Sequence, residues 1–450
     1  MDNKKTSVGR VRWTILAMLL CATTINYMDR VALAQLKPIF EVELKWTEAD
    51  YAKIVFSFQL AYAIGLAVVG RFMDWAGTRK GLAIIIGLIG CASASHALLF
   101  FVPVDGMITI GSITVTSTVA FMCLTRFALG LAEAGTWPGC IKVVSEWLPR
   151  KERSLGSGVV NAGSGIGSTI MPYVVRWLLA VVSWPFVFLF TAFLDLMLLI
   201  IWLFKYQTPA QHPKLSKEER EYIEGDLDVP TGKISWFQLL GHRQTWAFVI
   251  AKGMSDPVWW FYLFWVPTFL ATQYKLTGAT PGETAAALAL PTMVVYLIAD
   301  TGSILGGWMS MYLIGKGWTI NAARKTVLLG CALCVVPVPL ATQGIGLWPS
   351  VILLGLAAGG HLGFSANVFT IATDTVPKKA VASLAGLGGM VASIGGMFMA
   401  ALVGWVLTVT DKNYFVLFLL APIAYVIALS ALQILLPRME VMKLEDDIKI

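Results

Sequence analysis

The sequence predicts an all-α membrane protein with twelve transmembrane helices in two pseudo-symmetric six-helix bundles. Three observations predict this fold: apolar runs of membrane-spanning length recur along the chain, basic residues gather in alternate loops, and two loop motifs of the first half return in the second. Hydrophobic residues make up 57% of the 450 residues and charged residues 14%, and the mean hydropathy is +0.72. A soluble core does not have this composition, so we expect a chain that crosses a membrane many times.

Each of the twelve apolar runs is close to the roughly 20 residues that a helix needs to cross a bilayer. They cover residues 13–36, 49–69, 81–103, 112–138, 155–178, 184–204, 245–271, 285–313, 325–343, 347–371, 381–408 and 414–436. The first run continues to Asp29 and Arg30 without a small-residue cleavage site. We therefore expect a retained helix and not a signal peptide.

Lysine and arginine are divided unevenly between the two sides of the predicted membrane. With a cytoplasmic N-terminus, four lie in the N-terminal tail, eighteen in the five inner loops and three in the C-terminal tail, against four in the six outer loops. The positive-inside rule then places both termini in the cytoplasm. This placement explains the formal charge of +7 and does not indicate nucleic-acid binding.

One long polar interruption, residues 205–243, separates the sixth run from the seventh. Within it, Ser216 followed by charged residues predicts a short surface helix with the serine as N-cap. We interpret the mixed charge as a solvated face, with a docking surface for a partner as the alternative. The predicted domains are an N-terminal bundle of residues 1–204, a cytoplasmic linker of residues 205–243 and a C-terminal bundle of residues 244–450.

The two halves share loop motifs at corresponding positions. The run from Gly70 to Lys80 after the second span has a degenerate counterpart that begins at Gly307, after the eighth. The sequence around Pro149 after the fourth span recurs around Pro377 after the tenth, an offset of 228 residues. Parallel six-helix repeats of this kind build one class of secondary transporter, with the substrate site near the midplane between the halves.

The run from Gly70 to Lys80 resembles the loop signature of the major facilitator superfamily: glycine, three residues, aspartate, then glycine and a closing basic pair. Within that superfamily, residues 27–30, 126–133, 145–154 and 161–167 resemble the anion:cation symporters, which carry sugar acids and other organic anions. The resemblance covers nearly the whole chain and implies the major facilitator fold.

Finer resemblances point to a substrate class. Residues 256–259, 299–300 and 360–361 look most like the bacterial hexuronate transporters, which carry glucuronate and galacturonate, whereas Asp29 is more similar to the galactonate type. The resemblance implies a secondary transporter of the bacterial inner membrane that takes up a sugar-acid anion, foremost a hexuronate, together with protons by alternating access. Symport of another organic anion (an aldonate, aldarate or aromatic carboxylate) and anion exchange remain as alternatives.

Arg126 and Glu133 are an arginine and a glutamate inside one apolar run. At about 100° per residue, seven residues bring the two side chains to within roughly 20° of each other, so they share one helix face. A charge near the middle of a membrane helix costs on the order of 3 kcal/mol or more, and such residues usually face a protein-lined cavity. The pair therefore predicts a transport pathway.

Candidate site residues follow from the same reasoning and from the resemblance. An organic anion in a desolvated cavity needs a fixed cation, and the planar fork of Arg30 can hold a carboxylate by two hydrogen bonds. Asp29 and Glu133 are the candidate proton-coupling residues, because burial favours a neutral carboxyl and a nearby arginine favours a charged one. For all three residues the alternative is a purely structural ion pair. The further substrate-binding candidates are Tyr27, Gln59, Tyr62, Arg126, Asn161, Trp260, His361, Ser365 and Asn367.

His361 is a candidate because the offset of 228 moves Glu133 onto it, although a lone histidine is as often a packing residue. At the cytoplasmic end, Asp74 with Arg79 and Lys80 is interpreted as a conformational latch, since such charges can bridge helices in one state and separate in another. Asp195, midway along the sixth span, has no partner evident in the sequence.

Other functional classes lack their expected features. A receptor would be expected to carry a signalling domain, and an enzyme to show metal-ligand or nucleophile spacing, whereas the four histidines are scattered. We expect no enzyme activity, no metal, no nucleic-acid partner and no cofactor, with the proton gradient as driving force. The expected partners are the substrate anion, protons and the lipid bilayer, and the chain is expected to act as a monomer.

Overall fold

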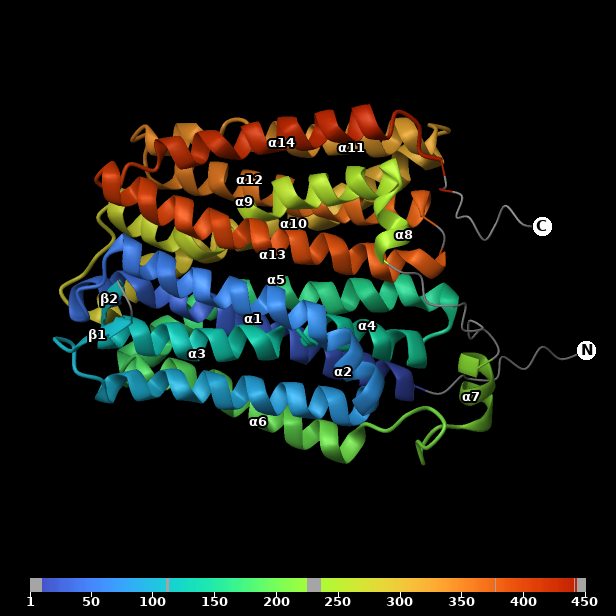
Figure 1. Ribbon diagram of the computed structural model, residues 1–450, viewed down its shortest axis with the longest axis horizontal. Coiled ribbons are helices and arrows are strands. Elements are labelled where there is room, and N and C mark those ends of the chain that lie inside the picture. The colour runs from blue at the N-terminus through green and yellow to red at the C-terminus, as the bar shows by residue number, and fades with distance from the viewer. Residues whose placement is uncertain (1–9, 111–112, 225–235, 377, 441, 443–450) are drawn as a thin grey trace, which may run out of the picture.

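The computed structural model describes residues 10–110, 113–224, 236–376, 378–440 and 442 (Figure 1). Long, roughly parallel helices fill it, and both termini lie at the same end. The first group occupies the lower half of Figure 1. It consists of α1 (Val11–Glu43), α2 (Glu48–His96), α3 (Ser117–Glu133), α4 (Thr136–Trp147), α5 (Arg150–Val181) and α6 (Pro185–Lys205).

The second group of long helices occupies the upper half of the same view. It consists of α9 (Arg243–Gln273), α10 (Pro281–Gly315), α11 (Ile320–Val335), α12 (Leu347–Thr375), α13 (Lys378–Val409) and α14 (Phe415–Leu435). The short elements are η1 (Ala97–Phe101), β1 (Met107–Ile110), β2 (Ile113–Thr116), η2 (Val338–Thr342), α7 (Lys217–Glu224) and α8 (Trp236–Leu240). β1 and β2 form an antiparallel hairpin that pairs Met107 with Thr116.

Ten segments of the described chain are long and apolar enough to cross a membrane. α5 and α9 are as long, with 32 and 31 residues, but fall outside that number. Glycine and serine lower the hydropathy of α5, and tryptophan, tyrosine and proline lower that of α9. With these two helices the architecture is consistent with the twelve predicted spans, and the chain is an all-α polytopic membrane protein.

The second and third predicted spans form one long element, α2, that turns back on itself at Gly77. This glycine has φ +72°, inside a stretch that is otherwise helical. An L-residue with a Cβ atom is strained in this left-handed region, so glycine is the residue that permits the turn. The fourth predicted span is divided instead: α3 ends at Glu133 and α4 begins at Thr136.

The two helix groups touch along two pairs of helices. α2 lies against α13 so closely that a Cβ atom on Gly404 would come within 2.3 Å of the Cβ atom of Ala52. α5 lies against α10, where Thr169 donates a hydrogen bond of 3.2 Å to Asp300. Small residues are what allow membrane helices to approach this closely.

At the end opposite the termini, further contacts join the two groups. The Nζ atom of Lys412, after α13, lies 3.4 Å from a carboxylate oxygen of Glu41 in α1. The hydroxyl of Tyr51 in α2 donates to the carbonyl of Phe264 in α9 over 2.9 Å. The halves are therefore held together at this end.

The linker is more than a solvated face. α7 begins after Ser216, whose hydroxyl accepts from the backbone N–H of Glu219 as the sequence predicted. Glu219 itself is fully buried and accepts hydrogen bonds from the backbone N–H groups of Val11 and Arg12 at the start of α1. A carboxylate at a helix N-terminus is favourable because the unpaired N–H groups point toward it. The interpretation of the linker as a solvated face was therefore wrong at Glu219. The domain boundaries at residues 204 and 244 stay a prediction.

Candidate substrate and proton site

The guanidinium of Arg30, in the second half of α1, is the cation around which the candidate site is built. Its Nε atom lies 2.5 Å from a carboxylate oxygen of Glu133, the last residue of α3. The side chains of Arg30 and Glu133 are 4% and 0% exposed. A buried ion pair is expensive to desolvate, and other contacts must offset that cost.

Aromatic rings provide such contacts on several sides of Arg30. The ring centres of Tyr62, Tyr27, Trp260 and Phe58 lie 4.8, 4.9, 5.3 and 5.6 Å from the guanidinium carbon. We call these four rings the aromatic cage. Each desolvated cation–π contact contributes on the order of 1–2 kcal/mol. Since Trp260 belongs to α9 and the other three to α1 and α2, the cage is built from both halves.

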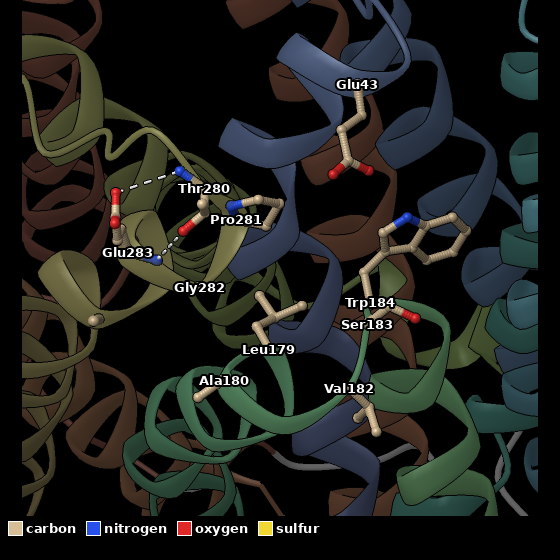
Figure 2. A pocket seen from close by; sticks show the side chains of 11 residues that line it. Glu43, Leu179, Ala180, Val182, Ser183, Trp184, Thr280, Pro281, Gly282 and Glu283 are labelled. Carbon is tan, nitrogen blue, oxygen red and sulfur yellow. Dashed lines mark hydrogen bonds between the residues drawn. The ribbon is translucent and has the colours of Figure 1, made fainter.

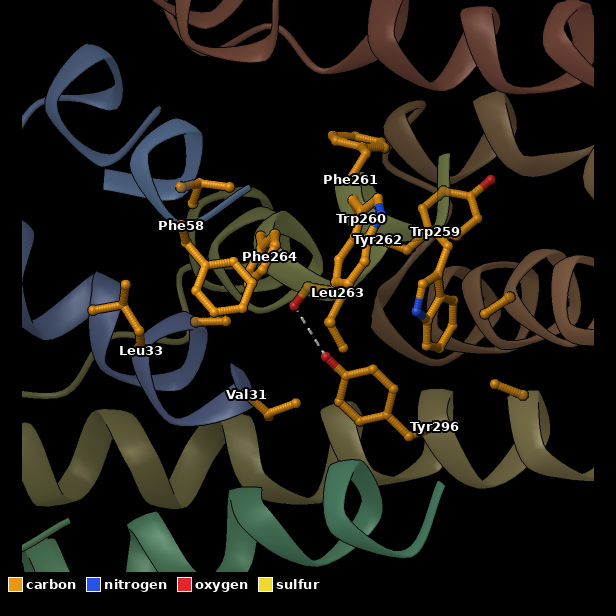
Figure 3. Close-up of a cluster of buried hydrophobic side chains, with 14 of the residues drawn as sticks. Val31, Leu33, Phe58, Trp259, Trp260, Phe261, Tyr262, Leu263, Phe264 and Tyr296 are labelled. Carbon is orange, nitrogen blue, oxygen red and sulfur yellow. Dashed lines mark hydrogen bonds between the residues drawn. The ribbon is translucent and has the colours of Figure 1, made fainter. Parts of the chain in front are cut away.

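Figure 3 shows the α9 part of this environment, where Trp259 to Phe264 project around the helix among buried side chains. Tyr296 of α10 donates its hydroxyl proton to the carbonyl of Leu263 over 3.3 Å. Of these rings, Trp260 is the one that reaches Arg30. The other aromatic residues of this run pack within the apolar core.

Arg126 does not pair with Glu133, although the two share a face of α3. Seven residues separate them by about 10 Å along the axis, too far for a direct contact. Instead, Arg126 donates from Nη1 to the backbone carbonyl of Asp29 over 3.3 Å. Its Nε and Nη2 atoms have no hydrogen-bond partner in the described part of the chain. The sequence identified the charged face correctly but not the ion pair.

Asp29 points in another direction from Arg30, because successive helix residues are about 100° apart. Its carboxylate accepts a hydrogen bond from Ser93 of α2, and its exposed fraction is 1%. The two proton-coupling candidates therefore lie in different surroundings. Glu133 faces the aromatic cage, and Asp29 faces the interior of the N-terminal helix group.

Gln59 lies beside the aromatic cage on α2. A Cβ atom on Gly396 of α13 would come within 3.2 Å of the Gln59 side-chain amide carbon and 2.7 Å of the Trp260 ring. Both amide atoms of Gln59 are buried without a hydrogen-bond partner among the described residues. An amide left unsatisfied beside a cation is available to a polar ligand.

Geometry alone does not identify a transported molecule, but comparison with known proteins places the chain in a family. A profile described as the Major Facilitator Superfamily matches residues 19–400. The chain belongs to this superfamily. It is therefore a multi-pass membrane protein of a transporter family.

Several curated relatives of this facilitator are transporters of sugar acids. It is 30% identical over 403 residues to the hexuronate transporter of Escherichia coli (strain K12), which covers 88% of this chain and 87% of the relative. It is 31% identical over 337 residues to the galacturonate transporter of Dickeya chrysanthemi, covering 73% of this chain and 90% of the relative. The D-galactonate transporter of Escherichia coli O6:H1 is 26% identical over 414 residues, with 88% and 89% covered.

Solved structures show the same fold at low identity. A crystal structure of a D-xylose-proton symporter superposes with a TM-score of 0.70 at 15% identity, covering 96% of this chain and 99% of that one. A bacterial homologue of the lysosomal transporter Spinster, in an inward-facing and occupied conformation, superposes with a TM-score of 0.62 at 13% identity, covering 95% and 96%. These likenesses support the major facilitator fold.

In the C-terminal half of this facilitator, Lys252 and Asp256 of α9 form an ion pair of 2.6 Å. The ammonium also donates to the hydroxyl of Ser365 in α12 over 3.3 Å. Ser365 was a candidate from the sequence, whereas the ion pair was not predicted. The i, i+4 spacing of a lysine and an aspartate was the available signal.

His361 lies inside the C-terminal half. Its Nδ1 atom is 2.6 Å from the hydroxyl of Tyr425 in α14, and its ring stacks on Trp259 with centres 5.3 Å apart. These contacts fit the packing interpretation, and a ligand role stays a prediction. Asn367 likewise donates to the backbone carbonyls of Gly306 and Gly363 over 3.0 and 2.9 Å, which ties α12 to α10.

Asn161 and the latch residues lie away from Arg30. The side chain of Asn161 is exposed on α5. Arg79 donates to the carbonyl of Leu203 at the end of α6 over 3.2 Å, and Lys80 is exposed. The side chain of Asp74 lies outside the described residues, so the latch as a whole stays a prediction.

Two cavities differ in position and size. The larger, about 400 Å³, opens at the end opposite the termini, where the α5–α6 turn meets the start of α10 (Figure 2). Glu43, Trp184 and Glu283 line it, and Arg30 does not. A cavity of about 10 Å³ lies deeper, between Ser164 of α5 and Asp300 of α10. It has room for about one water molecule.

Proposed function

We propose that this chain is a proton-coupled symporter that takes up a sugar-acid monoanion, foremost a hexuronate, across the bacterial inner membrane. Both termini then lie in the cytoplasm. The single observation that carries the proposal is the buried Arg30–Glu133 ion pair inside the aromatic cage. The hexuronate, galacturonate and D-galactonate transporters among its relatives support the substrate class.

Substrate recognition follows from the chemistry of the cage. The substrate carboxylate takes the place of Glu133 on the Arg30 guanidinium, which can hold it by two charge-assisted hydrogen bonds. The aromatic cage offers faces to the C–H groups of the sugar ring. Gln59, with its unsatisfied amide, is suitably placed to bond a hydroxyl group.

Proton coupling follows from charge balance at Arg30. One buried guanidinium compensates one carboxylate, and a second carboxylate beside it would be uncompensated in a low-dielectric site. Glu133 must therefore take up a proton when the substrate carboxylate arrives. Substrate and proton therefore bind together, and the release of either one changes the charge balance that holds the other in the site.

Translocation follows from the contacts between the halves. The ion pair between Lys412 and Glu41 and the Tyr51 hydrogen bond hold the end opposite the termini closed. Under the proposed orientation this is the outer end. Substrate uptake requires these contacts to open and the halves to rock about the central site. The Arg79 contact with α6 at the other end is part of the proposed latch.

The proposal includes no cofactor and no catalytic step. The partners are the substrate anion, protons and the bilayer, and the monomer is the working unit. The driving force is the proton gradient.

Transport into membrane vesicles tests the proposal. Labelled hexuronates, aldonates and aldarates are offered to vesicles with an imposed proton gradient, with and without an uncoupler. We expect hexuronates to accumulate, and the uncoupler to abolish accumulation while exchange of preloaded substrate continues. Accumulation that is insensitive to the uncoupler would reject proton coupling.

A dianionic aldarate is the second candidate substrate, because Lys252 provides a buried cation in the C-terminal half and a probable galactarate/D-glucarate transporter of Bacillus subtilis is 27% identical. Lys252 is already compensated by Asp256, so a second substrate carboxylate would require a second proton, on Asp256. Proton uptake per substrate separates the cases: an aldarate should be accompanied by one proton more than a hexuronate.

A further inference from the structure

Asp195 is a carboxyl group in the middle of α6, a helix whose outer face is apolar. The neighbours Phe193, Leu196 and Met197 are exposed on that face, whereas Asp195 points inward with an exposed fraction of 3%. An ionisable residue buried inside a membrane span is costly and usually has a functional partner. Neither the substrate site nor the proposed coupling at Glu133 uses it.

The partner of Asp195 is Asp29. The two carboxyl groups lie within hydrogen-bonding reach of each other. Ser93 of α2 joins them from the side: it donates to Asp29 and lies 2.8 Å from the hydroxyl of Thr191, one turn before Asp195 on α6. The polar network therefore runs from α1 through α2 to α6.

Gly90 makes the approach of α6 possible. A Cβ atom on this residue would lie 3.1 Å from the Cβ atom of Asp195, closer than such contacts ordinarily are. Gly90 and Ser93 are three residues apart and share a face of α2. The same face that admits Asp195 thus supplies the hydroxyl that bonds Asp29.

Each of the two carboxyl groups has an oxygen without a partner. Oδ2 of Asp29 and Oδ2 of Asp195 are both buried and accept no hydrogen bond from any described residue. Two carboxylates in contact in a buried site cannot both ionise, because the repulsion is not screened by water. One proton shared by the two carboxyl groups removes the repulsion. The protonated group then donates a hydrogen bond to an oxygen of the other.

No other charged group described around the pair neutralises the second carboxylate in place of this proton. Arg126 of α3 bonds the backbone of Asp29 and not its carboxyl group, and Arg30 is occupied by Glu133. His96 of α2 has its Nδ1 atom 2.7 Å from the carbonyl of Ala92, and Arg126 opposes a positive charge on its ring.

The balance of charge among the buried groups also calls for one proton on the Asp29–Asp195 pair. Arg12, Lys37 and Glu48 are also buried in the N-terminal half, but they lie in ion pairs of their own. The remaining buried charged groups around the pair are two guanidinium groups, of Arg30 and Arg126, and three carboxyl groups, of Glu133, Asp29 and Asp195. One proton on the Asp29–Asp195 pair brings their sum to zero. A neutral interior is what a low-dielectric surrounding favours.

We propose that Asp195 and Asp29 share a single proton and form a second proton-binding site, distinct from Glu133. Its part in transport rests on the proposed function, but its existence does not. Arg126 is the group that can empty the site, because its unpartnered Nε and Nη2 atoms lie on the same side chain that already reaches Asp29. A guanidinium that moves onto the Asp29 carboxylate favours release of the proton.

Infrared spectroscopy of the purified protein without substrate tests the site directly. A protonated carboxyl group has a carbonyl stretching band, sensitive to deuterium exchange, that a carboxylate lacks. The measurement is made in the wild-type protein, in which Glu133 is ion-paired with Arg30 and, as a carboxylate, contributes no such band. We expect one buried protonated-carboxyl band at neutral pH, and its loss in Asp195→Asn, because Asp29 then ionises beside Arg126.

The matched control is Asp105→Asn, since that aspartate is exposed to solvent in the described loop. It should leave the band unchanged. If Asp195→Asn does not insert, Asp29→Asn is measured in its place and must shift or remove the band. Absence of the band in the wild-type protein, or a band that persists unaltered in the variant, would overturn the proposal.

Transport supplies a second measurement. With Asp195→Asn, the lone Asp29 holds its proton only in more acidic solution, so the pH midpoint of uptake should move down by about one unit or more. Asp195→Glu should restore the midpoint, which a merely structural role would not predict. Failure of the hexuronate or coupling proposals would appear in the substrate panel and in Glu133→Gln, and would leave the infrared result standing.

Discussion

Arg30 is the residue on which the substrate site depends. Arg30→Lys replaces a planar fork by a point charge, which cannot hold a carboxylate at two points and fits the aromatic cage less well. We expect uptake to fall by at least about 100-fold while the protein remains folded and inserted. Binding and uptake are measured on the same vesicle preparation, with thermal unfolding as a check. Wild-type affinity in Arg30→Lys would remove this residue from the site.

His361 is a second single residue whose role a substitution can test. His361 contacts Tyr425 and stacks on Trp259 inside the C-terminal half, so His361→Gln loses a ring contact there. We expect the melting temperature to fall by a few degrees and substrate affinity to change less than twofold. An affinity loss without a change in melting temperature would instead make His361 a ligand, as the repeat offset first indicated.

At the scale of the elements, the turn inside α2 depends on one glycine. Gly77 has φ +72° with open space around it, so the cost of Gly77→Ala is backbone strain of about 1–2 kcal/mol and not a clash. We expect a lower melting temperature. Gly307→Ala is the control, because that glycine is helical and a Cβ atom there would meet nothing within 4 Å. Equal melting temperatures in the two variants would contradict this account of the turn.

The sequence predicted the helices better than it predicted the contacts between them. Apolar length and the side preference of basic residues are local properties, and they located most of the long helices within a few residues. The exceptions are α1, which continues to Glu43, α11, which ends at Val335, and the fourth span, which is divided into α3 and α4. Contacts between helices are not local. Glu133 pairs with Arg30 because α3 ends beside α1, and Asp195 meets Asp29 because Gly90 lets α6 approach. No spacing within a single span could reveal either contact.

Of the candidate site, the sequence anticipated the chemistry better than the geometry. Arg30, Tyr27, Tyr62 and Trp260 do gather around one guanidinium. Their residue types suit an anion-binding site, and the family resemblance covered the positions of Tyr27 and Arg30. Asn161 and His361 lie elsewhere in this structure, because a residue predicted from the sequence of one span or from a repeat offset can face its own bundle as well as the cavity.

For the whole molecule, the closed end opposite the termini is the feature that sets the conformation. Replacing Glu41 and Lys412 by cysteines should allow a bifunctional thiol reagent with a reducible spacer to cross-link the halves, since the ends of these two long side chains lie 3.4 Å apart. We expect the cross-link to reduce uptake to background and a reductant to restore it. A cysteine pair at Lys45 and Asp105 is the control, because both lie in the first half, 3.9 Å apart, and cross-linking them should leave uptake intact. Uptake that continues through a complete Glu41–Lys412 cross-link would show that this end does not open.

Coupling between substrate and proton is the central claim, and Glu133→Gln tests it most directly. Glutamine mimics the protonated acid, so the cavity and Arg30 remain available to substrate, but no proton can be released to the gradient. Vesicles with this variant are assayed in parallel for uphill accumulation and for exchange of preloaded substrate at equal pH. The account predicts that accumulation is lost while exchange persists; accumulation of substrate against its gradient by Glu133→Gln would contradict it.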